Sequence, residues 1–160
     1  MRNRLALLPL VLVVLLLTGS DSYANLRRGT IFSGKTKAFE LITETNGFST
    51  FALIYDRFET DLDLAVGLPD GTLIAASISQ QPHLELLQTG LVALQRYIIV
   101  VDSFEGPDTV FRLVVNSSQQ DTIAVPGLQQ SRIRLREIEL DEGARKIASQ
   151  LKTIAAKSKR

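Results

Sequence analysis

The chain has 160 residues, of which 45% are hydrophobic, enough for the core of one domain with short appendages. It has no cysteine, which excludes disulfides and thiolate metal sites. His83 is the one histidine, so a metal centre built from several histidines is also excluded. The formal net charge is +1, but residues 25–130 hold 7 basic and 12 acidic residues, whereas residues 131–160 hold 9 basic and 4 acidic ones. A nucleic-acid-binding domain usually carries its basic patch on the folded body, so this distribution argues against nucleic acid as a partner.

Residues 1–24 have the pattern of a signal peptide. Arg2 and Arg4 precede residues 5–17, which carry no charge, and small residues follow. Ser22 and Ala24 stand three and one residues before a cleavage point, which predicts cleavage after Ala24. The apolar run is shorter than the roughly 20 residues of a membrane span. We therefore expect an exported protein, periplasmic or secreted, with no stable membrane span after cleavage; the alternative is an uncleaved anchor.

Short stretches of alternating or continuous apolar residues, separated by turn residues, predict about eight strands. The Asn46-Gly47 pair predicts a hairpin between the second and third. Residues 96–102 are apolar on both faces, which is typical of a central strand. The spacing favours an antiparallel sandwich or barrel. The expected strands are residues 29–33, 36–43, 48–55, 61–66, 74–78, 83–88, 96–102 and 109–116.

The chain is organised around a predicted hairpin within residues 51–79. Its turn is Leu68-Pro69-Asp70-Gly71, in which proline pre-sets the backbone at the second position and glycine suits the exit. Before the turn, polar and apolar residues alternate with period two. We expect Leu62, Leu64 and Val66 to point into the core, and Asp61 and Asp63 to point outward on a shared face.

The periodicity changes after the strand region, which ends at Pro126-Gly127. Residues 128–140 are predicted as a linker, although Ile133 and Leu135 alternate like a strand. Residues 141–157 predict an amphipathic helix whose acidic start and basic end complement the helix dipole. Either this helix packs on the sandwich, or it binds an acidic partner or an anionic membrane surface. Its apolar stripe contains Leu140, Ala144, Ile147, Leu151 and Ile154.

A series of weak motifs in residues 29–116 resembles the bacterial pre-peptidase C-terminal domain. The motifs are Gly29, the strand with Phe39, Asp61-Leu62-Asp63-Leu64, Pro69-Asp70-Gly71, Tyr97-Ile98-Ile99-Val100 and Phe111-Arg112-Leu113-Val114-Val115. The sequence departs from the family at Gln95, where the family has glycine. The resemblance implies a jelly-roll-like β-sandwich, here residues 25–127, which accompanies exported enzymes without being catalytic. Some relatives bind calcium or an extracellular polymer.

The acidic residues around the hairpin are the candidate metal ligands. Asp61 and Asp63, together with Asp70 or with the nearby Asp56 and Glu59, offer the oxygen ligands that calcium takes. The predicted metal ligands are Asp61, Asp63 and Asp70. The alternative is that these carboxylates are turn-forming and solvated residues that bond local backbone amides.

Catalytic chemistry has little support in the sequence. A Ser-His-Asp site would have to use His83, and no Gly-x-Ser-x-Gly motif is present. Asp61 and Asp63 could form the carboxylate pair of a hydrolase, but no cleft is recognisable around them. Tyr55, Tyr97 and Phe111 are expected in the core, with an aromatic platform for a polymer as the alternative.

The leading hypothesis is an exported, non-enzymatic β-sandwich module, with calcium as a candidate ligand. It would bind or assemble with a protein or polymer at the cell envelope or outside the cell. A second hypothesis is a small hydrolase or enzyme subunit with an unrecognised site. A third, suggested by the family resemblance, is an accessory or inhibitory partner of an exported protease.

Overall fold

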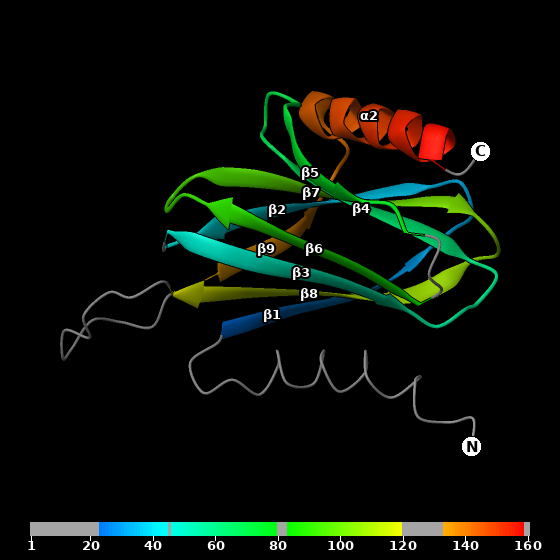
Figure 1. The fold of residues 1–160 in the computed structure, drawn as a ribbon, viewed down its shortest axis with the longest axis horizontal. Coiled ribbons are helices and arrows are strands. Elements are labelled where there is room, and N and C mark those ends of the chain that lie inside the picture. Colours follow the sequence, from blue (N-terminus) through cyan, green and yellow to red (C-terminus); the bar gives the residue numbers. More distant parts are fainter. Residues whose placement is uncertain (1–22, 45, 80–82, 120–132, 159–160) are drawn as a thin grey trace, which may run out of the picture.

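The computed structural model describes residues 23–44, 46–79, 83–119 and 133–158, which form two antiparallel sheets and one helix (Figure 1). Sheet A has the strand order β1-β8-β3-β6, and sheet B has the order β5-β4-β7-β2-β9. The first eight strands pass between the sheets in the order of a jelly roll, and β9 extends sheet B beside β2. The predicted all-β, antiparallel, jelly-roll-like sandwich with a C-terminal helix is therefore confirmed.

The strands are bounded as follows. Sheet A contains β1 (Tyr23–Ile31), β8 (Thr109–Gln119), β3 (Gly47–Tyr55) and β6 (Leu84–Leu91). Sheet B contains β5 (Leu73–Ser77), β4 (Asp61–Gly67), β7 (Arg96–Glu105), β2 (Thr36–Thr43) and β9 (Ile133–Ile138). The helix α2 spans Glu142–Ser158.

The hairpin predicted at Asn46-Gly47 is wrong. The strands on either side belong to different sheets, since β2 pairs with β7 and β9 whereas β3 pairs with β6 and β8. Asn46 instead holds two loops together, because its Oδ1 accepts a hydrogen bond of 2.8 Å from the Ala93 amide. A turn signal reports only that the chain turns, and pairing between distant strands decides which sheet each strand joins.

The first strand and the predicted linker differ most from the prediction. Strand β1 runs along residues 23–31 and not 29–33, so Arg27 and Arg28 lie within it. Arg27 donates to the Leu135 carbonyl and so links β1 to β9. The predicted linker contains a ninth strand, residues 133–138, paired with β2. Both are edge strands, which pair on one side only.

The main core lies between the two sheets. Leu62, Leu64 and Val66 are fully buried in it, as the alternation in β4 predicted. Phe39 of β2 and Phe111 of β8 meet edge to face across the core, with ring centroids 6.1 Å apart. Tyr55, Tyr97 and Phe111 are all buried, which confirms their prediction as core residues. The Tyr97 hydroxyl accepts from the Val92 amide and donates to Gln95 Oε1, so Gln95 helps to orient the tyrosine.

A second apolar cluster joins α2 to the outer side of sheet B (Figure 1). Ala144, Ile147 and Leu151 of the helix are fully buried there, against strand residues that include Ile98 and Val100. The helix thus docks on its own sandwich, one of the two alternatives left open by the sequence. In the described part of the chain, no helix is long and apolar enough to cross a membrane. The predicted signal peptide lies almost wholly outside the described residues and stays a prediction.

Candidate functional site

The structure does not bring the three predicted metal ligands together. Asp61 begins β4 and Asp70 lies in the turn beyond its end, so at a rise of about 3.3 Å per residue they stand some 20 Å or more apart along the strand. Asp70 Oδ1 accepts from the Thr72 amide, and this hydrogen bond lowers the pKa of Asp70 below its usual value. Within the described ranges, no group of three or more acidic or histidine side chains is placed to hold a metal ion. The three residues thus do not fit a shared calcium site.

Asp61 and Asp63 do not form the solvated pair that the alternation predicted. The register of β4 and β7 shifts between Asp61 and Leu62, which re-aims the side chain at the start of the strand. Asp63 is fully buried and pairs in register with Asp102 of β7, which is also fully buried. Two carboxylates opposite each other repel, and Lys152 of α2 offsets this with its Nζ 3.3 Å from Asp102 Oδ1. The pair therefore lies on the helix side of sheet B, and Asp102 helps to hold the helix through Lys152.

Together with burial, the charge of Asp61 instead raises the pKa of two groups, the Glu85 carboxyl and the Tyr55 hydroxyl. Glu85 of β6 is fully buried, and its carboxylate accepts hydrogen bonds from the Ser77 and Ser79 hydroxyls and the Ser79 amide. Burial raises the pKa of Glu85, and the charge of Asp61 adds to the effect. Burial also raises the pKa of Tyr55 to about 12, with Glu85 and Asp61 contributing. Glu85 ties β6 to the end of β5 and to the residues just after it, so its role is to join the two sheets.

His83 is oriented by the backbone. Its Nδ1 lies 2.8 Å from the Tyr55 carbonyl oxygen, and its ring packs edge to face on Phe58 with centroids 3.8 Å apart. A catalytic triad needs a carboxylate at that nitrogen to orient the imidazole. In this structure a backbone carbonyl takes that place, so the geometry gives no support to a Ser-His-Asp site.

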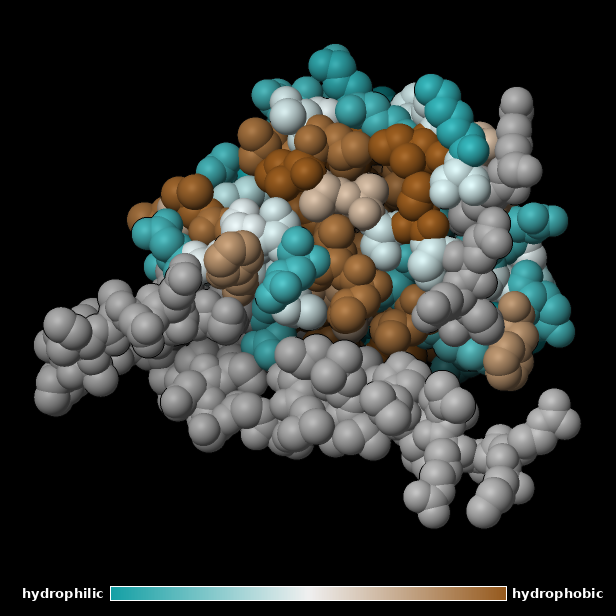
Figure 2. Space-filling model, in the orientation of Figure 1, coloured by the Kyte–Doolittle hydropathy of each residue, from teal (hydrophilic) through white to brown (hydrophobic). Residues whose placement is uncertain are grey.

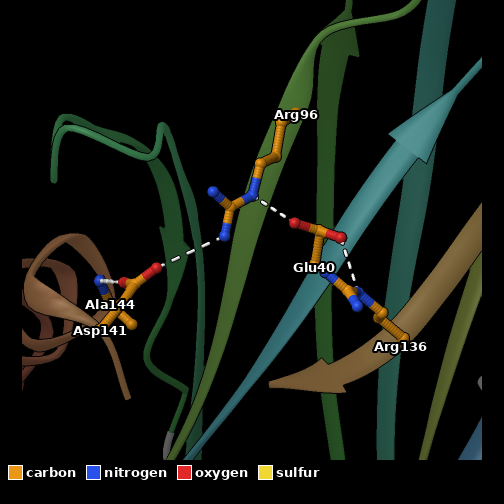
Figure 3. Close-up of polar contacts among 5 residues, drawn as sticks. All are labelled: Glu40, Arg96, Arg136, Asp141 and Ala144. Carbon is orange, nitrogen blue, oxygen red and sulfur yellow. Dashed lines mark hydrogen bonds and ion pairs between the residues drawn. The ribbon is translucent and has the colours of Figure 1, made fainter. Parts of the chain in front are cut away.

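A chain of charged residues fastens the start of α2 to sheet B (Figure 3). Asp141 caps the helix by accepting a 2.8 Å hydrogen bond from the Ala144 amide, and its other oxygen lies 3.4 Å from Arg96. Arg96 also pairs with Glu40, which accepts a 2.7 Å hydrogen bond from Arg136 of β9. The hydrogen bond from Arg136 and the charge of Arg96 lower the pKa of Glu40. This network holds α2 on sheet B. Each charged side chain in it already pairs with another member of the network, so we assign it a structural role.

The outer face of sheet A differs from that of sheet B, because no described element covers it. An apolar row crosses all four strands in register: Leu26 of β1 pairs with Val114, Val114 with Ala52, and Ala52 with Leu86 of β6. Leu26 and Leu86 at the ends of the row are 43% and 42% exposed, whereas Ala52 and Val114 in its middle are each 8% exposed and lie outside the apolar clusters of the interior. Figure 2 shows hydrophobic residues gathered over the middle of β3 and β6. We call this surface the sheet A face.

Two arginines stand beside the apolar row. Arg28 of β1 pairs in register with Arg112 of β8, and Ile54 of β3 continues the row on the other side. Both arginines are exposed, and neither forms an ion pair or a side-chain hydrogen bond with any other residue that the structure describes. Side chains opposite each other on antiparallel strands have Cβ atoms about 5 Å apart, and like charges there destabilise the sheet. Within the described residues, the sheet A face therefore places two adjacent guanidinium groups without an acidic partner beside the exposed side chain of Leu26.

Sequence reasoning missed the sheet A face. Its strands come from distant parts of the chain, and Arg28 was expected to precede the first strand. One signal was available: residues 109–116 place Val110, Arg112 and Val114 on the side away from the core, and two of these are apolar. Outward-facing apolar residues in a strand indicate a surface that something covers.

Comparison with known proteins leaves the family open. No family model matches the chain, and no curated protein matches it. Among solved structures, Aeromonas hydrophila PliG, a periplasmic inhibitor of g-type lysozyme, is 14% identical with a TM-score of 0.46, over 62% of this chain and 90% of its own. The Yersinia pseudotuberculosis-derived mitogen is 10% identical with a TM-score of 0.46, over 69% of this chain and 94% of its own. Both likenesses are too distant to bear on function, and the resemblance to the pre-peptidase C-terminal domain stays a prediction.

Proposed function

We propose that this chain is an exported, non-enzymatic binding module whose sheet A face docks on a protein partner. The observation that carries the proposal is the pairing of Arg28 with Arg112 beside the row from Leu26 to Leu86. Arginine and large apolar side chains are enriched at the centres of protein interfaces. Export rests on the signal-peptide pattern of residues 1–24. The binding role is favoured over catalysis because the carboxylates singled out by sequence lie apart or in structural contacts.

The chemistry of the face defines its partner. Two adjacent guanidinium groups call for one or more carboxylates, which accept bidentate hydrogen bonds from arginine. The apolar row beside them calls for apolar side chains around that acidic group. A second copy of this chain does not meet this requirement, because a symmetric interface pairs the face with itself and the described outward residues of sheet A include no carboxylate. The partner is therefore a different protein, with an acidic group set in an apolar surface.

The test is affinity capture of exported proteins with the chain that begins at Asn25. A captured protein is then purified and its Kd measured by titration calorimetry. Arg112→Glu and Leu86→Asp should each weaken binding at least tenfold, as expected when a central interface contact is lost. Arg134→Glu and Leu94→Asp are the matched controls, since they make the same changes at exposed positions off the face. Affinities that fall equally in controls and face variants, or no specific capture, would overturn the proposal.

A further inference from the structure

The helix α2 leaves a groove along one flank. It packs mainly over β4 and β7, and a hollow of about 720 Å³ lies beside it. Thr36 of β2 and Leu140, which precedes the helix, line one side of the hollow, and α2 supplies the other lining residues. We call it the helix groove. It lies on sheet B, so it is distinct from the sheet A face and does not depend on the function proposed above.

The helix groove is lined by cations. Arg145, Lys152 and Lys157 all line it, and none of its described lining residues is acidic. Arg145 and Lys157 are exposed and form no ion pair or side-chain hydrogen bond with another described residue. Lys152 is anchored by the buried Asp102, which also accepts a hydrogen bond from the Thr36 hydroxyl. Ser149 adds a hydroxyl on the same flank.

The spacing of the cations sets the shape of a ligand. At a rise of 1.5 Å per residue, Arg145 and Lys157 are about 18 Å apart along the helix, with Lys152 between them. One small anion can contact only one of them closely. A chain of anionic groups laid along the groove can contact all three, and the sum of such contacts gives affinity that one contact lacks.

We propose that the helix groove binds an elongated polyanion, a chain bearing phosphate or sulfate groups. Lysine and arginine are the side chains that bind such groups. A lipid surface is the less suitable occupant. An amphipathic helix binds membranes through its apolar face, and Ile147 and Leu151 of that face are already buried against sheet B.

The experiment uses linear polyphosphate long enough to span the groove, with binding to the chain from Asn25 measured by titration calorimetry. Orthophosphate at the same phosphate concentration is the control for length, and phosphatidylglycerol vesicles are the lipid arm. The double variant Arg145→Gln/Lys157→Gln should lose about fivefold in affinity for each cation removed. Lys146→Gln is the matched control, because Lys146 neighbours Arg145 but contacts the Asp70 carbonyl and does not line the groove.

Binding of polyphosphate that weakens in the double variant and persists in Lys146→Gln supports the proposal. A loss in Lys146→Gln as large as the loss per cation in the double variant would show attraction to net charge alone and would overturn it. Binding to vesicles without binding to polyphosphate, or equal affinity for orthophosphate, would also overturn it. Thermal melting of each variant checks folding, since both changes are at exposed positions.

Discussion

Glu85 and Glu40 are buried carboxylates whose pKa values shift in opposite directions. Among the described residues, Glu85 accepts hydrogen bonds from serine groups alone, and burial raises its pKa, whereas Glu40 lies between two arginines and its pKa falls. A raised pKa means that the folded state holds a proton that the unfolded chain has released. The stability from Glu85 is thus complete below its unfolded pKa and is lost as pH rises through its folded pKa. For Glu40 the stability is present above the unfolded pKa and is lost as pH falls through the lower, folded value.

The Glu85→Gln variant should therefore lose part of the pH dependence of folding. In urea unfolding from mildly acidic to neutral pH, the free energy of unfolding of the natural chain should decline above the unfolded pKa of glutamate, about 4.3. That decline should be absent or smaller in the variant, because glutamine does not titrate. Glu40→Gln is the control, since it should change the free energy of unfolding only at the acid end of the pH range. An unchanged slope in Glu85→Gln would contradict the assignment.

Calcium should leave the melting temperature unchanged, because Asp61, Asp63 and Asp70 lie apart. A ligand that binds only the folded state raises stability by about 2.7 kcal/mol at a hundredfold excess over Kd. The measurement is thermal melting with millimolar calcium and then with chelator. A rise that chelator reverses and that Asp63→Asn abolishes would instead establish a calcium site that uses backbone oxygens.

At the scale of the element, α2 is held by an N-terminal cap, a glycine contact and an apolar face. Asp141 caps its first turn, and Gly143 lies directly against the turn between β4 and β5. A Cβ on Gly143 would come within 2.1 Å of the Pro69 carbonyl oxygen. The close approach of turn and helix therefore requires glycine at this position.

Gly143→Ala should destabilise the fold, although alanine is favoured over glycine in a helix by about 1 kcal/mol. The helix start or the turn must move to admit the methyl group, and such overpacking costs typically 1–3 kcal/mol. Chemical denaturation would measure the net loss. Gly90→Ala is the matched control, because a Cβ there meets no atom within 4 Å. A Gly143→Ala variant more stable than the natural chain would show that the helix does not press on the turn.

Leu151→Asp should lower the stability of the whole domain by several kcal/mol, because Leu151 is fully buried between α2 and sheet B. Ile154→Asp, three residues further along the same helix, should have a small effect because Ile154 is 37% exposed. Thermal melting compares the two. Equal melting temperatures for Leu151→Asp and the natural chain would mean that the helix does not contribute to the fold.

At the scale of the whole molecule, the two sheets have different surroundings. Sheet B is covered by α2, and the sheet A face has no described cover. The predicted cut after Ala24 would fall inside β1, which begins at Tyr23, so the mature chain would lose only two positions of the ladder with β8. The remaining strand keeps Leu26 and Arg28, which the sheet A face requires.

The mature protein is expected to begin at Asn25. N-terminal sequencing of the exported protein tests this directly. Met1 retained in a membrane fraction would show an anchored protein instead, and would restrict the partners of the sheet A face to proteins at that membrane.

The local pattern of the sequence determined much of this molecule. Alternation placed Leu62, Leu64 and Val66 in the core, the Pro-Asp-Gly turn joined β4 to β5, and the helical stripe identified α2 to within one residue at each end. These features depend on residues close together in the chain. There, the repeat of apolar residues and the identity of the turn residues determine the local structure. The tertiary structure alone decided the rest. Strand pairing between distant segments placed Arg28 opposite Arg112 and buried Asp63 against Asp102, and the docking of α2 set Gly143 against Pro69. Local sequence carries no signal for such contacts, because the energies that select them come from packing across the sandwich.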